Sequence, residues 1–382
     1  MKIYLVSPSH YLPDGSTHKT TRYWTSGTTL PYLKRLTPGE HDVAMVDELF
    51  YDVDLDSDAD VVGLTAMGPQ IARAYDLADH FRARGRKVVL GGTWVTLTAE
   101  ESLAHADAVV AGEAEGVWRS VLADLAAGRS RGIYRASEWH SLRDLPAIDY
   151  RELPLLKWEA FHKSWFYRMY FHWPIVFSRG CPHPCEYCAV QTYYRRSYRT
   201  RPVEDVLADI EQIRSLGGDR LLFLDDNPIG RPEDAKQLFQ AMIPYKVKWA
   251  SQSTINIARD DELLDLAARS GCVSLSIGLE SVNEESLAGV KKEFNLPKRF
   301  SRDLKAIRDK GIQVIALIMV GLDGDDVGTF GRTLEFLIDN KVSFLKMFTP
   351  CPYPGTKYYA ELKAAGRIRT DDLRRYDYGS PL

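Results

Sequence analysis

The sequence predicts an α/β protein made of a doubly wound parallel sheet at the N-terminus and a partial (β/α)6 barrel after it. Two observations lead to this prediction. Short apolar runs alternate with amphipathic stretches through the first 130 residues, which is typical of parallel strands joined by crossover helices. The same alternation returns after residue 172, beyond an irregular stretch that is rich in Pro, Arg and aromatic residues.

The predicted strands of the N-terminal sheet are short apolar runs. They occupy residues 3–6, 43–46, 61–65, 87–90 and 108–110. Between the third and fourth runs, apolar residues recur at helical spacing until the stretch stops near Gly85. These residues are Ile71, Ala74, Leu77, Ala78 and Phe81. A helical crossover requires parallel pairing, so residues 1–130 are expected to form a Rossmann-like domain.

The second domain is expected over residues 173–366, after a linker at 131–172 and before a polar C-terminal tail at 367–382. Its predicted strands are residues 221–224, 247–251, 274–277, 313–320 and 344–349. The helices predicted between them are residues 204–215, 233–243, 261–270, 298–310 and 326–340. Repeated β/α units curl into a barrel, or part of one, and present ligand-binding groups at the carboxyl ends of the strands.

Length and composition exclude several classes of protein. A chain of 382 residues exceeds the ~250–300 residues of a single core, which favours two domains. The net charge of -3 lacks the basic excess of a nucleic-acid binder. No apolar run is long enough to span a membrane, and the start MKIYLVSPSH lacks the apolar core of a secretory signal. The protein is therefore expected to be cytoplasmic, with no membrane span and no nucleic-acid partner.

Three of the five cysteines lie within eight residues, as Cys181, Cys185 and Cys188. Prolines and a glycine prevent a regular helix here, so the thiolates can wrap one metal cluster from a loop. A cubane cluster has four irons, and three thiolates leave one iron open to another ligand. A zinc site with His183 as the fourth ligand is the alternative, but this histidine lies between two prolines inside the loop. Cys272, like Cys351, is expected to be a buried small hydrophobe.

The spacing C-x-x-x-C-x-x-C, with Tyr187 just before the third cysteine, resembles the signature of the radical S-adenosylmethionine (SAM) superfamily. The resemblance implies that the three cysteines bind a 4Fe-4S cluster and that SAM chelates its open iron. An electron from the cluster then cleaves SAM to methionine and a 5'-deoxyadenosyl radical. A flavodoxin or ferredoxin is the electron donor that the resemblance implies.

The same resemblance assigns SAM contacts to residues at strand ends. Asp225 and Asp226 match the position that receives the amino group, although acids there also cap helices. Gly278 and Glu280 match the segment near the ribose and methionine. Further candidates are Tyr187 and Gly321 near the adenine, Gln252 and Ser253 near the ribose, and Arg199 with Arg201 at the carboxylate. Packing, a simple turn or a solvated surface is the alternative for each of these further candidates.

The N-terminal part resembles the cobalamin-binding domain that is fused to many radical SAM enzymes. The residues that carry this resemblance, and that are expected to contact cobalamin, are Thr65, Gly91, Gly92, Gly112 and Glu113. The D-x-H-x-x-G segment, which supplies a cobalt-binding histidine in one group of cobalamin proteins, is absent. Trp94 stands where many relatives have histidine, and its indole is expected to shield the lower face of cobalt. A Rossmann-like sheet without a ligand remains the alternative.

The combined resemblance, from Ile3 to about Gly366, implies a cobalamin-dependent radical SAM methyltransferase. Its substrate is expected to be an unactivated carbon of a lipid or natural product. The alternative is a radical enzyme of the same architecture that performs cyclisation, carbon–carbon coupling or rearrangement. A module that binds the cluster or cobalamin without catalysis is the third hypothesis, and Asp225, Gly278 and Glu280 together argue against it.

Overall fold

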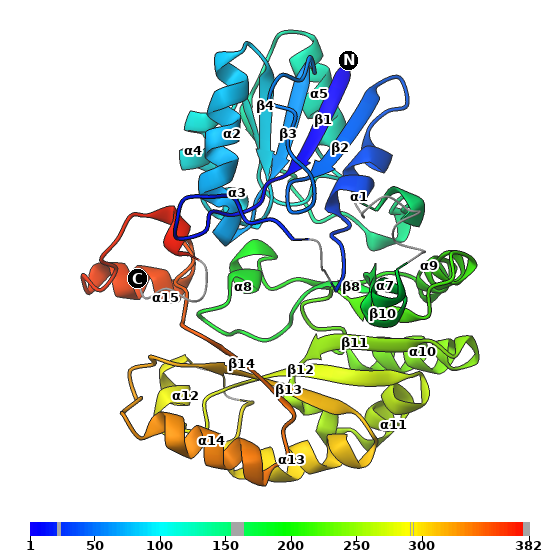
Figure 1. Cartoon of the computed structure of the whole chain (residues 1–382), viewed down its shortest axis with the longest axis vertical. Helices are drawn as coiled ribbons and strands as arrows, with labels where there is room; N and C mark the ends of the chain where they lie inside the picture. Colours follow the sequence, from blue (N-terminus) through cyan, green and yellow to red (C-terminus); the bar gives the residue numbers. More distant parts are fainter. Residues whose placement is uncertain (21–23, 154–163, 291, 293, 377–382) are drawn as a thin grey trace.

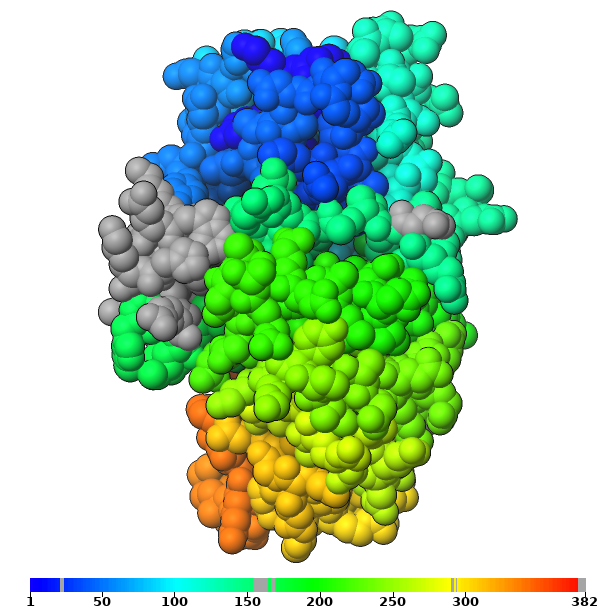
Figure 2. Space-filling view, turned by 90° about the vertical axis from the view of Figure 1, so that its right-hand side faces the viewer, coloured from blue at the N-terminus to red at the C-terminus, as the bar shows by residue number. Residues whose placement is uncertain are grey.

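The computed structural model describes residues 1–20, 24–153, 164–290, 292 and 294–376. Within these ranges the chain forms two parts stacked along the long axis of the molecule (Figure 1). Each part is built on a six-stranded sheet. Figure 2 shows the N-terminal part, in blue and cyan, lying against the second part, in green to orange.

The first sheet has the strand order β2-β1-β3-β4-β5-β6, with all neighbours parallel. Its strands are β1 (Lys2–Ser7), β2 (Asp42–Asp47), β3 (Val61–Thr65), β4 (Lys87–Gly91), β5 (Ala108–Val110) and β6 (Gly132–Tyr134). The helices are α1 (Thr29–Leu36), α2 (Ile71–Ala83), α3 (Thr93–Leu97), α4 (Ala99–Ser102) and α5 (Trp118–Ala126). Apolar clusters lie on both faces of this sheet, one under α2 and the other under α1 and α5, so it is doubly wound as predicted.

The five predicted strands of this sheet are present, each within one residue of its expected bounds. The sixth strand, β6, falls in the stretch predicted to be a linker. It has three residues and buries only Tyr134, so it lacks the fully buried apolar run that revealed the equally short β5. The N-terminal sheet therefore extends beyond residue 130.

The second sheet has the order β14-β13-β12-β11-β10-β7, again with parallel neighbours. Its strands are β7 (Trp173–Ile175), β10 (Arg220–Phe223), β11 (Lys248–Ser253), β12 (Cys272–Glu280), β13 (Gln313–Met319) and β14 (Phe344–Phe348). The outer helices are α9 (Val203–Ser215), α10 (Pro232–Met242), α11 (Asp261–Arg269), α12 (Glu284–Val290), α13 (Pro297–Asp309) and α14 (Thr329–Asp339). Spatial order follows chain order, and within the described residues the edges β7 and β14 are not paired with each other, which describes a partial barrel.

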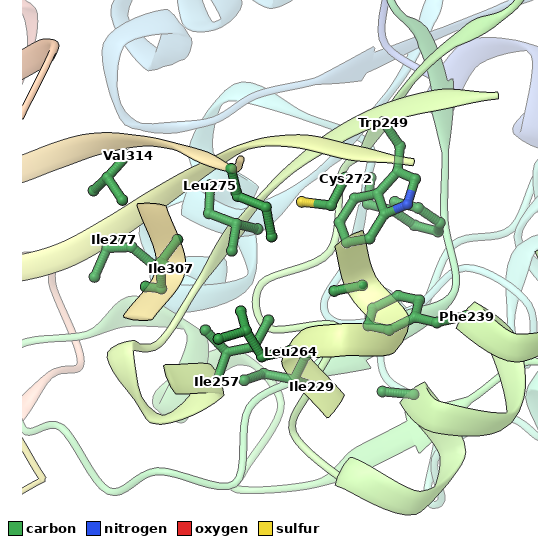
Figure 3. Packing of buried hydrophobic residues seen from close by; sticks show 14 of the residues in the cluster. Ile229, Phe239, Trp249, Ile257, Leu264, Cys272, Leu275, Ile277, Ile307 and Val314 are labelled. Atoms are coloured by element: carbon green, nitrogen blue, oxygen red, sulfur yellow. The ribbon is translucent and has the colours of Figure 1, made fainter. Parts of the chain in front are cut away.

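Aromatic and aliphatic side chains fill the space between the second sheet and its helices. Phe239 of α10 stacks on Trp249 of β11, with ring centroids 4.9 Å apart. Cys272 lies in the same core, near Trp249 and Leu275 (Figure 3), which agrees with its expected role as a small buried hydrophobe. Among the described residues, no helix combines the length and apolarity that crossing a membrane requires.

The last part of the chain leaves β14 and returns to the N-terminal sheet, ending beside it after α15 (Lys357–Ala364) (Figure 1). Tyr353 and Tyr376 are buried in the apolar cluster under α2. The returning segment therefore joins the two parts a second time.

Candidate cofactor site between the two sheets

The cysteine loop, residues 181–188, follows the first strand of a small antiparallel ribbon. The ribbon pairs β8 (Ser178–Gly180) with β9 (Tyr198–Thr200). Gly180 has a φ of +88°, and a Cβ added to it would lie 2.1 Å from the carbonyl oxygen of Ser197. Only glycine therefore allows the ribbon to close at this point. Cys181 follows directly, and Cys188 precedes the short helix α8 (Ala189–Tyr193), so both ends of the loop are fixed.

The three cysteines of this loop are free thiols, of which Cys185 is buried and Cys181 and Cys188 are half-buried. Burial raises the pKa of Cys185 to about 11 and that of Cys188 to about 12, so both are neutral thiols until a metal displaces the proton. The side-chain amide of Asn227 donates to Cys181 Sγ at 3.8 Å. The His183 ring packs on Phe294, with centroids 4.2 Å apart, and this contact opposes the zinc alternative. Three thiols on one loop fit the ligand set of a 4Fe-4S cluster.

The side chain of Asp225, at the end of β10, forms its hydrogen bonds with the start of the ribbon and not with a ligand. Its carboxylate accepts hydrogen bonds from the backbone N–H groups of Phe177 and Ser178 and from Ser178 Oγ, and the residue is 1% exposed. The Asp225 carbonyl also accepts from the amide of Gln252 at 3.0 Å. This differs from the predicted contact between the Asp225 side chain and SAM. Asp225 instead holds the strand from which Cys181 emerges.

Asp226 is the acid that faces open space. It lines the cavity between the two sheets, and one of its oxygens accepts from the Gly180 N–H at 3.3 Å. Burial raises the pKa of Asp226 to about 6. Of the two predicted acids, Asp226 is therefore the one placed to meet a ligand.

Glu280, at the end of β12, binds both Tyr187 of the cysteine loop and Lys292. The sequence did not indicate Lys292 as a residue of the site. The Oε1 atom of Glu280 accepts from Tyr187 Oη at 3.0 Å and from Lys292 Nζ at 2.6 Å. Glu280 and Lys292 are buried, and Tyr187 is half-buried. A Cβ on Gly278 would lie 2.4 Å from Glu280 Oε1 and 2.7 Å from Lys292 Nζ. The glycine was predicted to let a ligand approach, but here it makes room for this ion pair.

The remaining two barrel candidates lie in ordinary local contacts. Ser253 is buried, and its hydroxyl donates to the carbonyl of Thr254 at 3.2 Å. Gly321, with a φ of +91°, begins a turn in which its N–H donates to the carboxylate of Asp325 at 2.9 Å. Gln252, in contrast, also lines the cavity.

A cavity of about 820 Å³ lies between the carboxyl ends of the N-terminal strands and the segments β8 and α8 on either side of the cysteine loop. Five predicted cobalamin contacts line it together, namely Thr65, Gly91, Gly92, Gly112 and Glu113. Gly112 has a φ of +106°, and of the described residues only the edge of Trp139, at 3.9 Å, would come within 4 Å of a Cβ added to it. This leaves open space for a bulky ligand. A wall of strand ends and glycines suits a nucleotide-like cofactor such as cobalamin.

Two family models match this chain. The Radical SAM superfamily matches residues 175–337, and the B12 binding domain matches residues 44–122. Residues 175–337 therefore form a radical SAM domain. The chain is an enzyme with a 4Fe-4S cluster and SAM, and its B12-binding domain adds cobalamin.

Similar proteins agree with these two matches. Bacteriochlorophyllide d C-12(1)-methyltransferase of Chlorobaculum tepidum is 29% identical over 88% of this chain and 73% of its own length. Anaerobic magnesium-protoporphyrin IX monomethyl ester cyclase of Rubrivivax gelatinosus is 25% identical over 92% of this chain and 68% of its own length. The solved radical SAM methyltransferase TsrM of Kitasatospora setae, at 17% identity, has a TM-score of 0.75 over 97% of this chain and 77% of TsrM. This radical SAM protein thus has the fold of TsrM.

In this radical SAM protein, Arg199, which was predicted to bind the SAM carboxylate, is paired with a protein carboxylate. Its guanidinium binds Glu113 at 2.7 and 2.9 Å, and it also donates to the carbonyl of His140. Arg201 binds Asp209 at 2.7 Å. Both arginines are therefore paired with protein carboxylates, and of the two Arg201 also lines the cavity.

The prediction that Trp94 shields cobalt is wrong for this structure. Trp94 is 1% exposed and packs in the core against Tyr353 and Tyr376, at centroid distances of 5.4 and 4.9 Å. The segment that returns from β14 supplies both tyrosines, and no local pattern could show this. Met67, just after β3, is 59% exposed and lines the cavity instead.

Proposed function

We propose that this chain is a cobalamin-dependent radical SAM methyltransferase that acts on an unactivated carbon of a lipid or natural product. The single observation that carries the proposal is the shared cavity. Its walls come from the strand ends of the B12-binding domain and, in the radical SAM domain, from strand ends and from the residues on either side of the cysteine loop. A methyl donor and a radical source can therefore act on one substrate in one space. The relatives named as methyltransferases support this assignment.

Each group of residues has a defined part in this proposal. Cys181, Cys185 and Cys188 hold the cluster, which with SAM supplies a hydrogen-abstracting radical, while bound cobalamin supplies the methyl group. Asp226 accepts hydrogen bonds from the amino group of SAM. Leu224, 37% exposed at the end of β10, lines the cavity with Met67 and keeps water from the reacting carbon.

The test is anaerobic reconstitution with iron, sulfide and cobalamin, followed by chromatography of the products. Methylation of an unactivated carbon is expected to yield 5'-deoxyadenosine and S-adenosylhomocysteine together, and a product heavier by one methylene. Formation of 5'-deoxyadenosine without S-adenosylhomocysteine, and with no mass gain, would instead establish the cyclisation or rearrangement alternative. The cyclase relative keeps that alternative open to test.

We expect the SAM affinity to depend on pH through Asp226. Its pKa of about 6 means that the carboxylate is charged above neutrality and becomes protonated as the pH falls through 6. A neutral acid attracts the amino group of SAM less, so affinity is expected to fall roughly tenfold for each unit below the pKa. Anaerobic equilibrium dialysis of the cluster-loaded protein measures this profile. Asp226→Asn is expected to bind weakly at all pH values, and an unchanged profile in this variant would remove Asp226 from the site.

Two further proposals concern the surroundings of the enzyme. We propose a reducing, cytoplasmic location, because all five cysteines are free thiols. We also propose a flavodoxin or ferredoxin as the electron donor, since cleavage of SAM consumes one electron. Replacing chemical reductant with flavodoxin and its reductase in the product assay tests the second proposal.

A further inference from the structure

Four charged residues join the B12-binding domain to the cysteine loop. Arg179 and Arg199 are directly opposite each other on β8 and β9. Glu113 and Glu115 follow β5 in the other domain. Arg179 binds Glu113 at 2.9 Å and Glu115 at 2.6 Å, and Arg199 binds Glu113 at 2.7 Å. We call these four residues the interdomain latch.

The latch is well shielded from water. The two glutamate side chains are 3–4% exposed and the two arginine side chains 18%. Arg179 lies over the ring of Tyr32, whose hydroxyl donates to Glu115 at 2.7 Å. Arg199 lies over the ring of Trp139, 5.1 Å from its centroid. Charges paired and stacked in this way hold one geometry more firmly than a solvated surface pair does.

The arginines of the latch lie next to the proposed cluster site, and its glutamates line the proposed cobalamin site. Arg179 is two residues before Cys181, and its neighbour Ser178 is fixed by Asp225. Glu113 belongs to the segment 112–115, all of which lines the cavity. A change that orders the cysteine loop must therefore also order the cavity wall.

We propose that the latch couples the two cofactors: loading of the 4Fe-4S cluster tightens the binding of cobalamin, and binding of cobalamin tightens the binding of the cluster. The four residues act as positioning residues, because none of them needs to touch a reacting atom. Thermodynamic linkage requires the same factor in both directions, and coupling between sites is typically between about 5-fold and 150-fold. The inference rests on the cobalamin-binding part of the proposed function.

The experiment measures the dissociation constant of cobalamin, by anaerobic absorbance titration, for cluster-free and for cluster-loaded full-length protein. In the wild type, loading is expected to lower this constant about tenfold. In Glu113→Gln and in Arg199→Met the ratio between the two forms is expected to fall to about one. Arg199 is outside the cavity wall, so its variant separates coupling from direct contact.

Glu48→Gln is the matched control. Glu48 forms a buried ion pair with Arg73 at 2.6 Å, and both partners belong to the N-terminal domain, so its variant is expected to keep the wild-type ratio. Cobalamin binding by cluster-free variants shows that their domain is folded. If the two dissociation constants of the wild type are equal, or if both latch variants keep the wild-type ratio, the proposed coupling is refuted and the proposed function is not. No cobalamin binding in either form of the wild type would overturn the latch and the proposed function together.

Discussion

Cys185→Ala is expected to abolish both iron binding and the formation of 5'-deoxyadenosine. Cys185 is buried at the centre of the loop, and two remaining thiolates leave two irons of a cubane without a protein ligand. Replacing a residue that hydrogen-bonds to a metal ligand typically lowers metal affinity or activity 10–100-fold. Loss of a ligand itself is therefore expected to lower activity by at least about 100-fold. Iron and sulfide content, visible absorption and product chromatography measure the effect.

Cys272→Ala is the control for this substitution. Cys272 is equally buried but lies in the barrel core beside Trp249, away from the cysteine loop (Figure 3). Its replacement is expected to leave the iron content unchanged and to lower the free energy of unfolding by about 1 kcal/mol. Full iron content and activity in Cys185→Ala would refute the cluster assignment.

The features that were predicted best depend on residues that are close together in the sequence. The three cysteines and the acids after β10 are short motifs, and strands of four residues or more, such as β3, show their apolar pattern directly. The strand β6 was not predicted because it buries only Tyr134, whereas β5, which also has three residues, buries all of them and was predicted. The strand β7 was not predicted either. In β7 a central proline, Pro174, removes a ladder hydrogen bond, which an edge strand tolerates and a sequence pattern does not reveal.

The features that the sequence did not reveal depend on pairs distant along the chain. Arg199 and Glu113 are 86 residues apart, so an arginine in a polar loop gave no sign of its partner. Lys292 stands in the charged run KKE between two helices, which is typical of a solvated surface. Only the fold brings its ammonium group to Glu280, and sequence spacing cannot distinguish a carboxylate that binds a ligand from one that binds a buried lysine.

Lys292→Met is expected to lower the free energy of unfolding of the barrel domain by about 3–5 kcal/mol, since it leaves a buried carboxylate without its counter-ion. Glu280 is 4% exposed, and among the described residues its Oε2 atom has no hydrogen-bond partner that could replace the lysine. Denaturant unfolding of the cluster-free protein, followed by tryptophan fluorescence, measures the loss. Because Glu280 also accepts from Tyr187, weaker retention of the cluster is expected in the same variant.

Two companion variants show whether the unpaired charge is the cause. Lys298→Met removes an exposed lysine, 85% accessible, whose nearest acid is Glu284 at 3.4 Å, and it is expected to change the free energy of unfolding by less than about 0.5 kcal/mol. The double variant Lys292→Met with Glu280→Gln removes both charges and is expected to recover most of the lost stability, because a neutral amide costs less to bury than a carboxylate. If the double variant were as unstable as Lys292→Met, packing of the lysine stem rather than charge would hold β12 to the cysteine loop.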